Sequence, residues 1–170
     1  MKLIESKTLA TAAASIEFTS IPQDGTDLVA LISGRQNGSN NANYAVVSFN
    51  SNTSNFSSRY LQGDGSSRSS GTLARFFGNI PGATSTSNTF GNIIFYVPNY
   101  AGSTNKSYSV DEVTENNATN AFQDIIAGLW TNTSAITSVT FTMSADNFVA
   151  GSTISLYKIT KGSDGIVTTS

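Results

Sequence analysis

Short alternating runs of β-branched and aromatic residues, separated by turn-forming clusters, are the feature that most constrains the fold of this 170-residue chain. In the clearest run, ITSVTFTM, the apolar Val139, Phe141 and Met143 alternate with small hydroxyl residues. Such alternation is typical of a β-strand with one buried face. Clusters of Gly, Asn, Asp and Ser interrupt the runs about every 8 to 15 residues, as in sandwiches and barrels. The pattern predicts an all-β protein.

Roughly ten candidate strands can be read in this way. They are residues 15–22, 27–35, 43–50, 58–65, 71–80, 90–100, 105–113, 121–130, 136–143 and 152–159. So many short strands in one chain predict a two-sheet antiparallel β-sandwich that is jelly-roll-like. We expect a single domain over residues 1–160 and a polar C-terminal tail over 161–170. The predicted core contains Phe18, Leu31, Phe49, Phe95, Phe141 and Leu156.

One run, AFQDIIAGLW at 121–130, fits two kinds of element. Phe122, Ile125, Ile126 and Leu129 have the spacing of one helix face. The same residues fit a buried strand in which Gly128 marks a bulge. The all-β context favours the strand.

Several strands are apolar on both faces, although one face of an antiparallel sheet normally meets water. In GSTISLYKI, Ile154 and Leu156 share one face, while Tyr157 and Ile159 lie on the other. The second face must be covered by the same chain or by another one. We expect a homo-oligomer, most simply a trimer. The candidate interface residues are Tyr157, Ile159, Tyr96, Tyr100 and Trp130; for Trp130, packing in the core is the alternative.

The chain has no cysteine and no histidine, which excludes disulfides, cysteine–histidine zinc sites, thiol nucleophiles and histidine-based triads. Carboxylates are the only strong catalytic groups that remain, and no pattern pairs a nucleophile with a base. The acidic stretch 111–115 offers the oxygen ligands that calcium prefers, but no EF-hand pattern accompanies it. We therefore expect no enzymatic activity, no metal and no cofactor.

Charged residues form only 12% of the chain, about half the usual share, and the net charge is −2. Nucleic acid is therefore not an expected partner. No run has the roughly 20 apolar residues of a membrane span, so no membrane partner is expected either. The first residues lack the apolar stretch of a secretory signal. We expect synthesis in a cytoplasm without export by the usual route.

Six stretches, in this order and spacing, make the chain resemble a group of small structural proteins of tailed bacteriophages. They are AAASIEFTSIPQDGTDLVALISGR, RYLQGDGSS, FGNIIFYVPNYAGSTNKS, ENNATNAF, AGLWTNTSAITSVTF and NFVAGSTISLYKI, spanning about residues 12–159. Proteins that look like this usually have glycine where this chain has Lys158. Because a lysine is costly in a dry core without a partner, we expect Lys158 to be paired or to face solvent.

The resemblance implies a jelly-roll-like virion component and brings no catalytic residues. Three functions stay open: a capsid decoration (cement) protein bound to the major capsid protein, the head of a tail fibre or spike that binds host glycan, and a carbohydrate-binding module outside any virus. The first is favoured by the low-charge surface, the doubly apolar strands and the absence of a coiled-coil stalk. The first two functions imply that the protein is located in a virion.

Overall fold

Residues 1–115 and 121–160, which the computed structural model describes, form twelve β-strands and no helix. The predicted tail at 161–170 lies outside the described residues. In chain order the strands are β1 (Lys2–Thr8), β2 (Ser15–Phe18), β3 (Asp27–Gly34), β4 (Ala42–Phe49), β5 (Phe56–Gly63), β6 (Arg68–Thr72), β7 (Phe76–Pro81), β8 (Gly91–Val97), β9 (Lys106–Thr114), β10 (Phe122–Trp130), β11 (Val139–Met143) and β12 (Thr153–Ile159).

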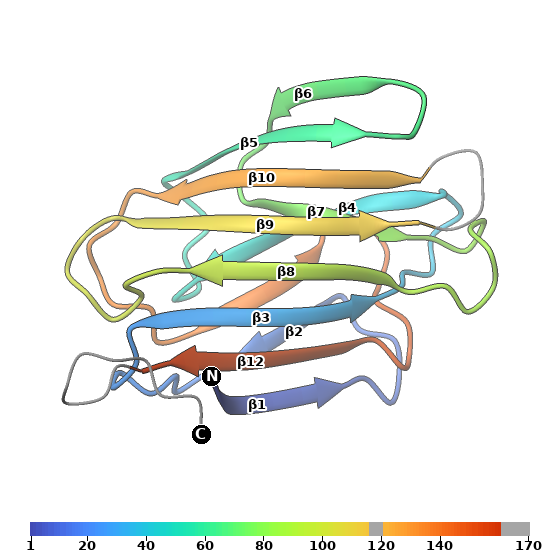
Figure 1. The fold of residues 1–170 in the computed structure, drawn as a ribbon. Helices are drawn as coiled ribbons and strands as arrows, with labels where there is room; N and C mark the ends of the chain where they lie inside the picture. Colours follow the sequence, from blue (N-terminus) through green and yellow to red (C-terminus); the bar gives the residue numbers. More distant parts are fainter. Residues whose placement is uncertain (116–120, 161–170) are drawn as a thin grey trace.

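The strands form two antiparallel sheets that face one another. The larger sheet has eight strands in the order β1-β12-β3-β8-β9-β10-β5-β6, and the smaller has four in the order β2-β11-β4-β7. Figure 1 shows the larger sheet in front, with the smaller one behind its central part and the β5–β6 hairpin at its upper end. The predicted two-sheet antiparallel sandwich is confirmed.

The order of the strands is that of a jelly roll with additions. β1 pairs with β12 and β2 pairs with β11, while β3 pairs with β8 and β4 pairs with β7. The chain thus crosses repeatedly from one sheet to the other, and early strands pair with late ones, as in an eight-stranded jelly roll. β9, β10, β5 and β6 extend the sheet that contains β1 beyond β8. This extension makes one sheet twice as wide as the other.

Aromatic rings fill the space between the sheets. The Phe49 ring lies 5.5 Å from Trp130 and 6.2 Å from both Phe95 and Tyr108, in edge-to-face arrangements that aromatic pairs prefer. The predicted core residues Phe18, Phe49, Phe95, Phe141 and Leu156 are all buried.

The sixth predicted core residue, Leu31, is on the wrong side of its strand. It is 37% exposed, because β3 directs Leu28, Ala30 and Ile32 toward the smaller sheet and Leu31 away from it. Since β3 is apolar on both faces, its alternation does not indicate which face is buried.

The ambiguous run at 121–130 is the strand β10, as expected. It pairs with β9 and with β5 without a shift in register, so Gly128 does not mark a bulge. A Cβ atom at Gly128 would lie 1.9 Å from Cζ of Tyr108. The glycine is therefore required by close packing against the Tyr108 ring on the neighbouring strand.

Lys158 points between the sheets, and only 6% of the residue is exposed. Its ammonium group donates a hydrogen bond to Oδ1 of Asp24, whose side chain is 69% exposed. This bond holds the pKa of Asp24 below its usual value. The expectation that Lys158 has a partner is confirmed.

Candidate interaction surface

The face of the eight-stranded sheet that points away from the smaller sheet is the main candidate site, and we call it the open face. Large apolar side chains on this face are between 37% and 63% exposed. They are Leu3, Leu31, Leu61, Ile94, Val113, Ile125 and Leu129. Among the described residues, the other large apolar side chains with comparable exposure are Met1, Tyr44 and Leu73. The exposed apolar surface is thus concentrated on one side of the molecule.

Strand register aligns part of this surface into a row. Leu31 pairs with Ile94, and Ile125 pairs with Leu61. Asp111 lies between these two pairs, because it is the partner of Ile94 on one side and of Ile125 on the other. With neighbouring strands about 4.8 Å apart, the row crosses five strands in about 20 Å. The row is therefore apolar except for the single carboxylate at its centre.

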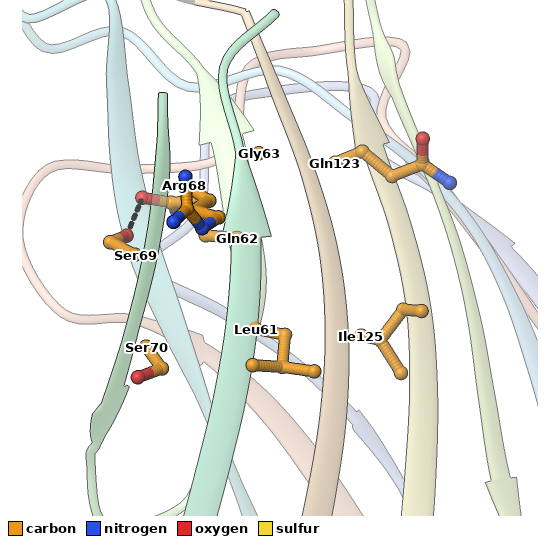
Figure 2. Close-up of a pocket in the computed structure, with 8 residues that line it drawn as sticks. All are labelled: Leu61, Gln62, Gly63, Arg68, Ser69, Ser70, Gln123 and Ile125. Carbon is orange, nitrogen blue, oxygen red and sulfur yellow. Dashed lines mark hydrogen bonds between the residues drawn. The ribbon is translucent and has the colours of Figure 1, made fainter. Parts of the chain in front are cut away.

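A shallow concavity of about 710 Å³ lies at the β5–β6 end of the open face. Figure 2 shows Leu61 and Ile125 with Gln123 on neighbouring strands, and Arg68 and Ser70 on β6. Leu61 and Ile125 are the two most exposed of the large apolar residues, at 63% and 61%. The concavity therefore combines an apolar floor with a polar rim.

The structure places three of the five predicted interface residues on the open face. Tyr157 and Tyr96 are both register partners of Val29, so they lie in one row, and both are half-buried. Ile159 follows two residues after Tyr157 on the same face and is also half-buried. Burial and the nearby Asp27 carboxylate raise the pKa of the Tyr96 hydroxyl. Tyr157 and Ile159 on β12 lie five strands away from Leu61 on β5, whereas Tyr96 on the central strand β8 lies three strands away.

The other two predicted interface residues are in the core. Tyr100 is 0% exposed, and its hydroxyl donates to the carbonyl of Pro22 and accepts a hydrogen bond from the backbone N–H of Gly25. Trp130 is 1% exposed and stacks against Phe56. Neither side chain offers surface to a partner, so both leave the candidate set.

The carboxylates of the acidic stretch 111–115 that the structure describes point to different sides of the larger sheet. Asp111 points outward and Glu112 inward, because they are consecutive residues of β9. Among the described residues no group of three or more acidic side chains is placed to hold a metal ion. Glu112 instead meets Asp124 between the sheets, where both are fully buried. The sequence analysis did not identify this pair.

The residues that dominate the open face, Leu61 and Ile125, were also missed as interface candidates. Both lie within predicted strands, but only the non-sequential pairing of β5 with β10 brings them together. The usable signal was the presence of large apolar residues on both faces of the run at 121–130.

No family model matches the chain, and no curated protein matches it. No helix in the described part of the chain is able to span a membrane.

Proposed function

We propose that this chain is a non-enzymatic structural protein of a tailed-bacteriophage virion, and specifically a decoration (cement) protein of the outer head surface that assembles as a homotrimer. The observation that carries the proposal is the open face. Exposed apolar surface gathered on one side of a soluble domain is typical of a protein–protein interface. The six stretches that resemble phage structural proteins support the same assignment.

The open face fits a subunit contact better than a catalytic role. Its charged side chains are Asp27, Asp111, Arg59 and Arg68, and they lie on separate strands. The register spaces them among apolar residues and gives no two of them a common partner. A surface of this kind is desolvated at little electrostatic cost, and its contacts depend weakly on salt. Closed cyclic assembly, or docking on the major capsid protein, would cover it.

Light scattering on the purified protein tests the assembly. We expect a mass three times the subunit mass of 17.8 kDa, at both low and high salt. The double variant Leu61→Ser and Ile125→Ser is expected to shift the mass toward that of a monomer while the circular dichroism spectrum stays that of a β-protein. The matched control is Tyr44→Ser with Leu73→Ser, which removes exposed apolar side chains outside the open face.

Two outcomes would contradict this assembly. One is a monomeric wild type at high micromolar concentration. The other is equal dissociation of the trimer by both double variants. A third double variant, Tyr157→Ser with Ile159→Ser, tests whether the interface extends to the β12 end of the face.

Imaging of the parent particle tests the location. A cryo-EM map of the virion is expected to show the sandwich on the outer shell of the head, with its open face in contact with a neighbouring copy or with the major capsid protein. If density for the sandwich is found only on the tail, the protein is a tail component and not a decoration protein of the head.

A second candidate function is the head domain of a tail fibre or spike that binds host-surface glycan. The concavity in Figure 2 favours it, because Gln62, Arg68, Ser69 and Gln123 surround exposed apolar side chains. None of the residues drawn there is aromatic, whereas sugar faces commonly stack on aromatic rings, so this function is placed second. Glycan-array binding that Gln123→Ala and Arg68→Ala both abolish would favour it over the decoration role.

A further inference from the structure

Glu112 and Asp124 are two carboxyl groups that face each other in the interior. They are direct register partners on β9 and β10, and both point toward the smaller sheet. Each residue is 0% exposed. Two acids so close and so far from water are costly if both are ionised.

Each carboxyl group has one oxygen with a donor and one without. Oγ1 of Thr114 shares its single proton between Oε1 of Glu112 and the carbonyl of Asn79, which lies 2.9 Å away. Nδ2 of Asn79 donates to Oδ2 of Asp124 over 2.6 Å. The remaining oxygens, Glu112 Oε2 and Asp124 Oδ1, are buried and accept no hydrogen bond from the described residues. A buried oxygen that accepts no hydrogen bond destabilises the fold.

No cation of the described residues compensates the pair. Neither acid forms a salt bridge with a described residue. The packed strand β7 contributes Asn79 and has no titratable side chain, and the nearest titratable side chain on the inner face of β5 is Tyr60. The buried lysine of β9, Lys106, is six residues away and donates to the carbonyls of Gly102 and Thr104.

We infer that Glu112 and Asp124 share one proton in the folded protein, bound between Glu112 Oε2 and Asp124 Oδ1. One shared proton gives both orphan oxygens a hydrogen bond and leaves the pair with a single negative charge. That charge is stabilised by the donors Thr114 and Asn79. The proton comes from solvent, so folding at neutral pH takes up one proton at this site.

The direction of the pH dependence follows from this uptake. Burial, together with the adjacent Asp124, raises the pKa of Glu112 above its ordinary value of 4.5. A raised pKa in the folded state means that the folded form binds more protons than the unfolded form. The stabilisation is therefore fully present below pH 4.5, the ordinary pKa of a glutamate, and is lost progressively as the pH rises above it. Each pH unit in that range lowers the folding equilibrium constant by about tenfold.

The test compares urea unfolding of the wild type and of Glu112→Gln between about pH 5.5 and 8. A glutamine keeps an oxygen for Thr114 and donates its own N–H to Asp124, so it replaces the proton permanently. The ratio of the wild-type to the variant folding constant is expected to fall by about tenfold per pH unit. Asp111→Asn is the matched control, since it removes a carboxylate from the outward face of the same strand. The ratio of the wild-type folding constant to that of Asp111→Asn should not change with pH.

Asp124→Asn and infrared spectroscopy provide independent readouts. The asparagine donates to Glu112, so this variant should lose the same pH dependence even if Glu112→Gln fails to fold. At pH 8 the wild type should show the C=O stretch of a protonated carboxylic acid, and neither variant should show it. The inference is overturned if wild type and variants have the same pH dependence. It is also overturned if added Ca²⁺ or Mg²⁺ at pH 8 raises the Tm of the wild type but not of Glu112→Gln, because the pair would then hold a cation.

Discussion

Replacing Gly128 with alanine is expected to be among the most destabilising single-methyl changes in this protein. The added Cβ would lie 1.9 Å from Cζ of Tyr108 and within 2.3 Å of both of its Cε atoms. These separations are more than an ångström shorter than ordinary contact, so the ring has to move. It has little room, because it is 2% exposed and stacks on Phe95, and its edge contacts Phe49.

The expected cost lies between two limits. Inserting a methyl group into a well-packed core costs about 1–3 kcal/mol. Complete expulsion of a buried aromatic ring costs about 3–5 kcal/mol. Because the Tyr108 ring is confined on two sides by other rings but is not removed, we expect a cost of about 3 kcal/mol, where the two ranges meet. A domain with an ordinary stability of about 5–15 kcal/mol would still fold.

Urea unfolding followed by the fluorescence of Trp130, the single tryptophan, measures the effect. The control is Gly63→Ala on the adjacent strand β5, where an added Cβ has no heavy atom within 4 Å. We expect that control to change the free energy of unfolding by less than about 1 kcal/mol. In a Tyr108→Leu background, Gly128→Ala should lose most of its cost, because the clashing ring is absent. Equal effects of the two alanine substitutions, or additive effects with Tyr108→Leu, would refute the packing argument.

Two further predictions concern polar groups at the edge of the core. Asp24→Asn should lower the free energy of unfolding, because it leaves the buried Lys158 ammonium without a carboxylate. Lys158→Met should change the free energy of unfolding by less than about 1 kcal/mol, since water can then hydrate the Asp24 carboxylate. The hydrogen bond from Lys158 lowers the pKa of Asp24, so its stabilisation is present above pH 3.8 and is lost as the pH falls below that value. Acid unfolding of both variants checks this direction. The same loss of stability below pH 3.8 in Asp24→Asn as in the wild type would contradict it. Tyr100→Phe removes the donor to Pro22 and the acceptor for Gly25, and thermal unfolding should show a loss of about 1–2 kcal/mol; a Tm equal to that of the wild type would show that water replaces the hydroxyl.

Local alternation was sufficient to predict most of the strands, and it failed at the edges of the larger sheet. β1 carries three charged residues and a register shift between Leu3 and Glu5, so it lacks a clean period of two. β6 reads RSSGT and has no large apolar residue. An edge strand has one neighbour and little buried surface, so its sequence is weakly constrained by burial. Such strands are specified by the partner strand, here β12 or β5.

The candidate surface and the buried acids required the sheet order, which the sequence does not contain in local form. Leu61 and Ile125 become neighbours only because β5 returns beside β10. Glu112 lies in the predicted strand 105–113 and was considered only as a possible calcium ligand, whereas it faces Asp124 on an inner face. Leu31 shows the same limit, since an apolar strand has two plausible inner faces. In each case a contact distant in sequence decides the role of the residue.

The edges of both sheets favour association through the open face over association by strand pairing. Unpaired edges are normally protected by charge, short length, proline or irregular backbone. Each edge strand here has such a feature: β1 carries Lys2, Glu5 and Lys7, β6 begins with Arg68, β2 has four residues, and β7 contains Gly78 at φ 136° and ends at Pro81. Within the apolar row of the open face only Asp111 is charged, and it splits the row into two halves. A partner that covers the row must therefore place a cation or a hydrogen-bond donor opposite Asp111, and this requirement selects one register of docking over its neighbours.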